Sequence, residues 1–472
     1  MSQAQEAPDP RRWTILMAVM LSAIMGPVDG SVVNVALPTL SAAFHAGLNT
    51  VGWVSMAYLL VLGTLILTYG RLGDMFGFRR VLLAGIGIFT VASAACALAP
   101  TIWVLIAFRA LQAVGAGMFM AVGPAIITAA FPAYERGRAL GINAMSIAAG
   151  LALGPALGGF LLTVSTWHAI FLINVPIGIA SFIWCHKVVP RTEHLTRQKF
   201  DVAGAVLGFV ALGSLLLVGS YGQEWGWASH LTTGLFAVVV LGTCAFVWWE
   251  RRAPQPMLDL SLFHNRVFSA ANAAALLNFT AQNAMVFLMP FYLQQVLNYT
   301  PSQVGLVMTV TAVATLLVAP VAGALSDRLG TRWLAFSGQV AVTLALLLMT
   351  GLGPASRPVG IAWRLGLFGV GLALFQSPNN SAVMGSVPRH RLGVGSGVLA
   401  TVRNVGMVTG IAVSTAVFTW QYSARLKVPG AMPTVGAFMG GLRAAYVAAA
   451  ILAGVGAVAS LVRDDALPAA AK

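Results

Sequence analysis

The sequence of 472 residues is 58% hydrophobic and only 8% charged, which excludes an ordinary soluble globular protein, in which charged residues make up about a quarter of the chain. A net charge of +14 would suit a nucleic-acid-binding protein, but the basic residues occur singly or in pairs between long apolar runs. That spacing is typical of membrane proteins that obey the positive-inside rule. The composition therefore predicts an all-α polytopic membrane protein that binds no nucleic acid.

Fourteen apolar runs are long enough to be membrane-spanning helices, because about 20 apolar residues cross the bilayer core. If both termini are cytoplasmic, most of the 27 lysine and arginine residues fall on the inner side. We therefore expect a multi-pass protein of the cell membrane with both ends inside. The expected spans are residues 13–37, 50–70, 81–99, 101–130, 139–163, 168–189, 201–221, 231–249, 267–291, 302–325, 333–352, 358–387, 393–420 and 439–462.

The first span contains an acidic side chain, Asp29, whereas the other acidic residues fall in tails, in loops or at span ends. A charge at membrane depth is costly and usually faces a partner or a cavity. Arg109 in the fourth span is the expected partner, since both residues lie about 12 Å from the outer ends of their helices at 1.5 Å per residue. Such a pair either binds protons and the charge of a substrate or is purely structural.

The chain repeats itself. The segment GRLGDMFGFRR (Gly70–Arg80) recurs as GALSDRLGTRW (Gly323–Trp333) 253 residues later, and IAFR, ending at Arg109, recurs as IAWR, ending at Arg364, 255 residues later. Nearly equal offsets indicate two homologous halves. The sequence thus predicts three parts: an N-terminal six-helix bundle in residues 1–189, a linker with two extra spans in 190–266, and a C-terminal six-helix bundle in 267–472.

The repeated segment between the second and third spans is a candidate gate at the inner face. Its glycines permit a tight turn, and Asp74 is placed to cap the positive end of the following helix. One copy alone would be an ordinary basic loop, but two copies at matching places favour a specific role. The candidate gate residues are Gly70, Asp74, Gly77, Arg79, Arg80, Asp327 and Arg332.

The fifth span contains the small-residue run GLALGPALGG. A spacing of four residues puts its glycines on one smooth helix face, which suits close helix packing with or without a transport role. The residues of this run that carry the pattern are Gly150, Gly154, Pro155, Gly158 and Gly159.

Together these motifs resemble the major facilitator superfamily. The segment WHAIFLINVPIG (Trp167–Gly178) and the two extra spans are similar to its fourteen-helix drug:proton antiporter branch. The resemblance implies that the repeated loop latches the inner gate shut against the other half, that Arg109 belongs to a family motif, and that the glycine run marks exporters and antiporters. Met75 stands where a basic residue is common, so we expect a weaker latch.

Other polar side chains at span depth are candidates for lining a cavity between the halves. Each is alternatively a helix-to-helix hydrogen bond. The candidates are Asn34, Gln112, Asn143, Gln282, Asn283, Gln376, Asn379 and Arg403.

From the resemblance we expect a proton-coupled antiporter that exports lipophilic, cationic compounds by alternating access. One carboxylate, Asp29, exchanges one proton for one charge, which favours monovalent cations. The expected partners are a small lipophilic substrate, protons and the lipid bilayer, with no cofactor besides the proton and a monomer as the working unit. Two alternatives stay open: an exporter of neutral or anionic metabolites or lipids, with Arg364 or Arg403 as the anion contact, and a membrane-embedded enzyme. No metal-ligand spacing or nucleophile–base set supports the enzyme.

Overall fold

The computed structural model describes residues 10–132, 135–190, 201–226, 228–253, 260–387, 392–426 and 435–462. These residues are almost entirely helical, and among them thirteen helices are long and apolar enough to cross a membrane. One further helix, α8, has a shorter apolar stretch at Val202–Leu215. The predicted all-α membrane fold is confirmed.

The helices fall into two groups with a pair between them. The first group is α1 (Arg12–Ala43), α2 (Leu48–Phe76), α3 (Phe78–Ala97), α4 (Ile102–Ala130), α5 (Arg136–Val164), α6 (Ala169–Leu172) and α7 (Asn174–Val188). The pair is α8 (Val202–Trp225) and α9 (His230–Glu250). The second group is η1 (Leu260–His264), α10 (Arg266–Phe291), η2 (Tyr292–Val296), α11 (Pro301–Leu329), α12 (Thr331–Met349), α13 (Pro358–Gly385), α14 (Leu392–Leu426) and α15 (Val435–Leu461).

The helix bounds follow the expected spans within a few residues, except for one divided span and three helices that run further than expected. The sixth span is divided at Ile173 into the short α6 and the longer α7. Three spans were expected to end at residues 37, 70 and 420, but α1 continues to Ala43, α2 to Phe76 and α14 to Leu426.

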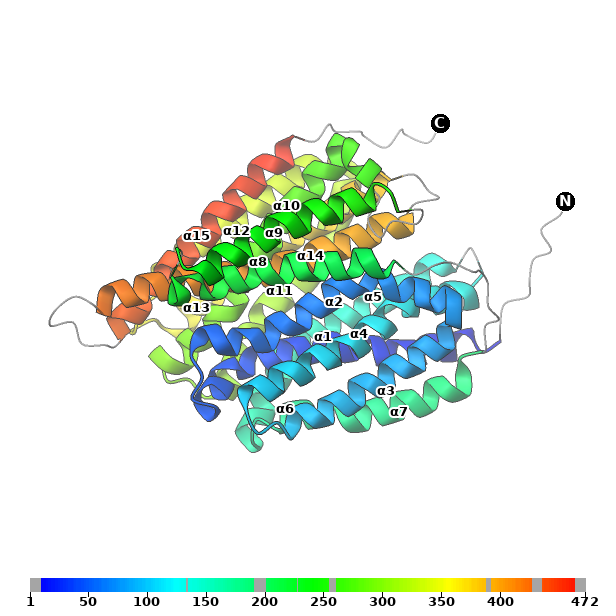
Figure 1. The fold of residues 1–472 in the computed structure, drawn as a ribbon, viewed down its shortest axis with the longest axis horizontal. Helices are drawn as coiled ribbons and strands as arrows, with labels where there is room; N and C mark the ends of the chain where they lie inside the picture. Colours follow the sequence, from blue (N-terminus) through cyan, green and yellow to red (C-terminus); the bar gives the residue numbers. More distant parts are fainter. Residues whose placement is uncertain are drawn as a thin grey trace.

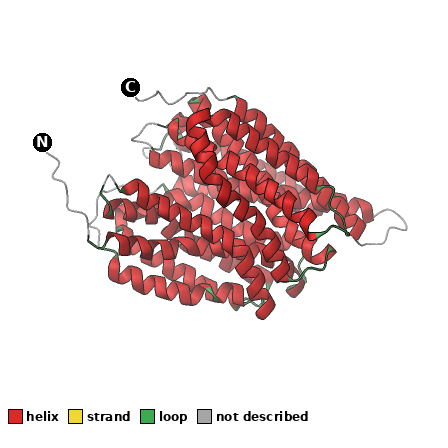
Figure 2. Ribbon diagram, turned by 180° about the vertical axis from the view of Figure 1, so that it is seen from behind, coloured by secondary structure: helices red, strands yellow, loops and turns green. Residues whose placement is uncertain are grey.

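The two groups pack side by side, with α8 and α9 crossing in front of the line where they meet (Figure 1). We call the groups the N-half and the C-half, and the line between them the seam. α8 packs against α2 of the N-half and α14 of the C-half, whereas α9 packs mainly on α8. Seen from behind, the described chain is likewise helical throughout (Figure 2). α1 begins and α15 ends at the same end of the bundle, here the terminal end; the opposite end is the far end (Figure 1).

The internal repeat is visible in the backbone. Gly77 joins α2 to α3 with φ 90°, and Gly330 joins α11 to α12 with φ 83°. Side chains other than glycine rarely adopt this region, so each copy of the repeated loop needs its glycine at the turn. The two halves therefore make the same tight connection at the terminal end.

Among the described side chains, the hydrophobic core that both halves share lies at the far end. There Leu37 and Leu40 of α1 lie in the same cluster as Phe287 of α10 and Tyr292 of η2. Towards the terminal end the apolar side chains form separate clusters, one confined to the N-half and another, containing Phe268, confined to the C-half. Within the described part of the chain, burial of apolar surface joins the halves at the far end, so this conformation is closed there. We call the terminal end parted, because the described apolar clusters of the two halves are separate there.

Small residues make the close contact across the seam at the far end. A Cβ atom at Gly159 of α5 would overlap the carbonyl oxygen of Pro301 in α11, and one at Gly305 would overlap the carbonyl oxygen of Pro155. Nearby, the side-chain amide of Gln294 donates a hydrogen bond of 3.2 Å to the Val35 carbonyl across the seam. The far end is thus closed by backbone contact that only glycine permits.

The remaining glycines of the fifth span face a different helix. Gly150, Gly154 and Gly158 pack against α1, where added Cβ atoms would meet Ile24, Ser31 and Val32 respectively. The run therefore joins α5 to α1 within the N-half and to α11 across the seam.

We predict that Gly159→Ala weakens closure of the far end, because its methyl group forces α5 away from Pro301. Spin labels at Val164 and Val359, which are both exposed at the far end, should then show a new population at longer distance in double electron–electron resonance. Gly234→Ala on α9 is the control, because a Cβ there meets nothing within 4 Å. Identical distance distributions in wild type and Gly159→Ala would contradict the prediction.

Candidate functional site

Asp29 lies inside the N-half, enclosed by neighbouring helices, with only 1% of its surface exposed. One carboxylate oxygen, Oδ2, forms an ion pair with the Arg109 guanidinium of α4. The other, Oδ1, accepts hydrogen bonds from the side-chain amides of Gln112 at 2.9 Å and Asn174 at 2.8 Å. The ion pair that matching depth predicted is therefore present, and both carboxylate oxygens are occupied in this conformation.

Arg109 is held by several groups besides the carboxylate. Its Nε donates to the Val54 carbonyl of α2 at 3.1 Å, and its terminal nitrogen also donates to Gln112 Oε1 at 2.5 Å. The Tyr58 ring lies under the guanidinium, 4.3 Å from its carbon to the ring centroid. A guanidinium over an aromatic face is stabilised by the ring electrons, the more so away from water. Helices α1, α2 and α4 thus meet at this one charge.

Two members of the network were missed from the sequence. Ser93 of α3 accepts a hydrogen bond of 2.7 Å from the Gln112 amide, and Asn174 begins α7 and donates to Asp29. Both are polar residues within apolar spans, and Asn174 stands inside the quoted WHAIFLINVPIG segment. That signal was available, but nothing in the sequence showed that they face Asp29.

The network has the chemistry of a proton site that is shielded from water. A guanidinium and two amide donors match the charge and lone pairs of a carboxylate, and their bonds to it weaken when the carboxyl group takes up a proton. Protonation would also leave Arg109 without its counter-ion inside the N-half, which is strongly unfavourable. The state of Asp29 is therefore coupled to the packing of five helices, α1, α2, α3, α4 and α7.

Most of the other candidate lining residues form hydrogen bonds within their own half. Gln112 is fully buried in the Asp29 network, so it is no cavity residue here. Asn34 accepts a hydrogen bond of 3.1 Å from Ser55, and Asn283 donates one of 2.6 Å to the Met407 carbonyl. Gln376 donates to Gln282 at 3.2 Å, joining α13 to α10. 

Asn143 and Asn379 are almost completely buried in α5 and α13. Arg403 of α14 is partly exposed.

The candidate gate residues are placed only in part. Arg79 donates to the His186 carbonyl at the end of α7, within its own half, and the Arg332 guanidinium lies 5.6 Å from the Trp333 ring centroid. Arg80 is exposed. The described contacts of these side chains stay within one half, as suits a terminal end that is parted. Gly77 forms the turn described above. The surroundings of Gly70, Asp74 and Asp327 lie outside what the structure describes.

Arg364, the repeat counterpart of Arg109, has a different environment. It donates to the carbonyl oxygens of Leu348 at 2.9 Å and Gly360 at 2.6 Å, and lies 4.6 Å from the Trp363 ring centroid. No described carboxylate forms an ion pair with it. The repeat therefore preserves the arginine but not the acid, so the buried ion pair belongs to the N-half.

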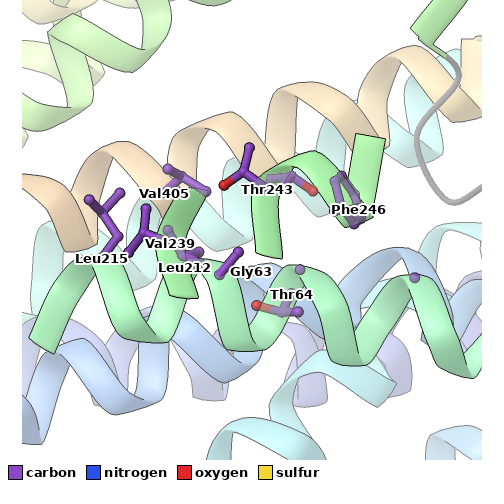
Figure 3. A pocket seen from close by; sticks show the side chains of 12 residues that line it. Gly63, Thr64, Leu212, Leu215, Val239, Thr243, Phe246 and Val405 are labelled. Atoms are coloured by element: carbon purple, nitrogen blue, oxygen red, sulfur yellow. The ribbon is translucent and has the colours of Figure 1, made fainter. Parts of the chain in front are cut away.

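A cavity of about 230 Å³ lies where α8 and α9 cover the seam (Figure 3). Gly63 and Thr64 of α2 line it on one side, Thr401 and Val405 of α14 on another, and Phe246 of α9 closes it. Its walls are mostly apolar, and the described lining contains no charged side chain. The charged network around Asp29 is elsewhere, within the N-half.

We predict that Asp29 and Arg109 contribute to stability as a unit. Asp29→Asn or Arg109→Gln should each lower the free energy of unfolding by about 3 kcal/mol, because each leaves a buried charge unpaired. The double variant should lose clearly less than the sum, by about 1–3 kcal/mol, when unfolding is followed in detergent. Glu135→Gln is the control, since the Arg12–Glu135 pair is exposed by 22% and 24% and should contribute no more than about 1 kcal/mol. Strict additivity at Asp29 and Arg109 would contradict the prediction.

Comparison with known proteins identifies the family. The model of the Major Facilitator Superfamily matches residues 19–411. The chain is 36% identical over 409 residues to the riboflavin transporter RibZ of Clostridioides difficile, covering 86% of this chain and 88% of that protein. It is 35% identical over 413 residues to the multidrug resistance protein Stp of Mycobacterium tuberculosis, covering 87% and 77% respectively.

Among solved structures, the fold resembles a bacterial homologue of the human lysosomal transporter Spinster in an inward-facing and occupied conformation. The TM-score is 0.70 at 16% identity, with 96% of this chain and 97% of that one covered. The sequence match and the two-half helical fold agree. The chain belongs to the major facilitator superfamily of membrane transporters.

Proposed function

We propose that the protein is a proton-coupled exporter of lipophilic compounds that works by alternating access between its N-half and C-half. Membership in a family of transporters excludes the membrane-embedded enzyme. Export is supported by relatives that are named for multidrug resistance. It is also supported by the glycine run of the fifth span, which resembles the motif that marks exporters and antiporters in this superfamily. Because a riboflavin transporter is also among the similar proteins, family membership alone specifies neither the direction of transport nor the substrate.

The observation that carries proton coupling is the enclosure of Asp29. Among described side chains it is the one carboxylate buried midway along a membrane-spanning helix, and it is bound to a guanidinium and two amides. A buried ion pair of this kind costs desolvation energy and is weak evidence for stability alone. An intramembrane ionisable group is therefore best explained by a change of charge during the transport cycle.

The geometry supports an indirect coupling. Asp29 lies on α1, whose next residues, Ser31 and Val32, pack on the glycines of α5, and whose Val35 carbonyl accepts a hydrogen bond from Gln294 of the C-half. Loss of the Arg109 contact on protonation would free α1 to shift against α4 and so change the closed far end. The proton would thus bias the two conformations without meeting the substrate.

This arrangement removes the reason for a monovalent-cation preference. That expectation required Asp29 to meet the substrate's charge, but both of its oxygens are bound within the N-half in this conformation. We therefore assign Asp29 and Arg109 to proton coupling and leave the selection of substrate charge to side chains at the seam.

We further propose that the protein acts as a monomer in the cell membrane with both termini in the cytoplasm. Most of its basic residues then lie on the inner side. In that orientation the terminal end is cytoplasmic, and the conformation described here is inward-facing.

We predict that Asp29→Asn abolishes export driven by a pH gradient. Purified protein in liposomes should move at least one of rhodamine 6G, riboflavin and fluorescein against its gradient when the opposite compartment is acidic. Asp29→Asn should lose this uphill movement and the accompanying proton flux, yet keep downhill exchange of the same compound, which shows that the variant is folded. Glu135→Gln is the matched control. Proton-coupled export that survives in Asp29→Asn would contradict the proposal.

A further inference from the structure

Arg403 is a cation within a membrane-spanning helix for which the structure supplies no acidic partner. It stands on α14, eleven residues after the helix begins at Leu392. The described ion pairs are Arg12–Glu135 and Arg109–Asp29, and no hydrogen bond of Arg403 is present among the described residues. An intramembrane arginine normally pairs with an acid or with carbonyl oxygens, as Arg109 and Arg364 do here.

The contacts of its neighbours fix the direction in which Arg403 points. Asn404 meets Gly63 of α2, and Val405 lines the cavity beside α8 and α9 (Figure 3). Gly406 packs on Leu276 and Phe279 of α10.

Successive residues of a helix are rotated by about 100°, so Arg403 and Val405 point to nearly opposite sides of Asn404. Arg403 therefore points away from the α8–α9 pair, into the sector between α2 of the N-half and α10 of the C-half. That sector is the seam.

Arg403 lies at the border between contact and separation of the two halves. Its neighbour Asn404 still contacts Gly63 of α2, whereas the described apolar clusters nearer the terminal end are confined to one half each. Its neighbours Leu399 and Val402 pack on the cluster of Phe268, which is confined to the C-half at the terminal end. The core shared by both halves lies beyond it, towards the far end. The partial exposure of Arg403 agrees with a position beside this parted region.

Carboxylates with described side chains lie elsewhere. Asp29 is enclosed in the N-half, Glu135 pairs with Arg12, and Asp201 and Glu250 lie at the ends of α8 and α9. The seam is thus electropositive at the depth of Arg403, since no described acid offsets the guanidinium. 

Amide groups lie further along α14 and α10 from this charge, towards the far end. Asn283 contacts Met407, one helical turn along α14 from Arg403, and its neighbour Gln282 is hydrogen-bonded to Gln376. Amides both donate and accept hydrogen bonds, so they suit the polar atoms of an otherwise apolar molecule.

We propose that Arg403 is the binding site for an anionic group, a carboxylate, sulfonate or phenolate, on an amphipathic substrate. This inference deepens the proposed function by naming the substrate class. A guanidinium offers five donors in a planar fork that matches such oxygens, and it is worth most where water is excluded. The anion would supply the counter-charge that the chain does not provide, and it would enter from the terminal end, where the halves are parted.

The proposal separates Arg403 from Arg364, the other arginine considered as an anion contact. The Nε and one terminal nitrogen of Arg364 donate hydrogen bonds to backbone carbonyls. No guanidinium nitrogen of Arg403 donates a hydrogen bond to a described group, so its donors are available to a ligand.

The first test measures binding, independent of transport, with two dyes that share a xanthene skeleton and differ in charge. Anionic fluorescein and cationic rhodamine 6G are titrated with purified protein, and their fluorescence polarisation is followed. Wild type should bind fluorescein more tightly than rhodamine 6G. Arg403→Gln should weaken fluorescein binding about ten- to hundredfold, the range for a lost hydrogen bond to a charged group, and leave rhodamine 6G binding unweakened.

Matched variants distinguish a ligand contact from a structural role. Arg403→Lys keeps the charge without the fork and should bind fluorescein with intermediate affinity. Arg364→Gln should not reduce it. Arg403→Gln should not lower the unfolding temperature, because it removes a charge that has no partner, whereas Arg109→Gln should lower it. A large loss of stability in Arg403→Gln, or equal fluorescein affinity in wild type and Arg403→Gln, would overturn the proposal.

Electrogenicity supplies a second test in liposomes. Export of an anion in exchange for an entering proton moves at least two charges in the direction that an inside-negative potential favours. A potassium–valinomycin potential should therefore accelerate export of fluorescein by wild type. Insensitivity of that export to the potential would contradict an anionic substrate that is exchanged for protons.

The outcomes for the two proposals are distinct. Arg403-dependent binding of fluorescein by a protein that moves no protons supports the anion site and contradicts only the coupling. Proton-coupled transport in which wild type and Arg403→Gln bind both dyes equally contradicts only the anion site.

Discussion

The cost of placing a charge inside a membrane protein governs the structure of the N-half. Asp29 and Arg109 are accommodated there because each contacts the other, and because Gln112, Asn174 and the Val54 carbonyl take up the remaining bonding capacity. Together with Ser93, which Gln112 contacts, these groups come from five helices, so the pair ties the packing of the half to one carboxylate. A proton added to Asp29 would remove the counter-charge of Arg109 and weaken the amide bonds to the carboxyl group, which makes the pair suitable for coupling.

The halves themselves are held by apolar contact and by glycine. At the far end Gly159 and Gly305 bring α5 and α11 together at backbone distance, while Gly63 allows α2 to approach Asn404 of α14. At the terminal end the cores are separate. Such an asymmetric interface suits alternating access, since one end can part while the other stays closed. The α8–α9 pair touches both halves at α2 and α14, so it is placed to follow their relative movement.

Charge is distributed in the two halves in different ways despite their common repeat. The N-half encloses an acid and a base together, whereas the C-half has Arg364 on carbonyl oxygens and Arg403 without a described acid. Proton coupling and substrate selection are thus assigned to different halves. An exporter built in this way would sense protons in one half and bind the polar end of its substrate on the other.

The sequence by itself determined the family, the helices, the repeat and the pairing of Asp29 with Arg109. These depend on properties local to a segment: apolar length, turn glycines, motif spacing and depth along a span. Only the tertiary structure decided which way each polar side chain faces. Depth does not specify rotation about the helix axis relative to neighbouring helices. Gln112 therefore looked like a cavity residue yet lies in the core, and the participation of Asn174 and Ser93 was missed. The same limit left Arg364 and Arg403 equivalent until their contacts were known, because partners distant in the chain determine which charges remain available.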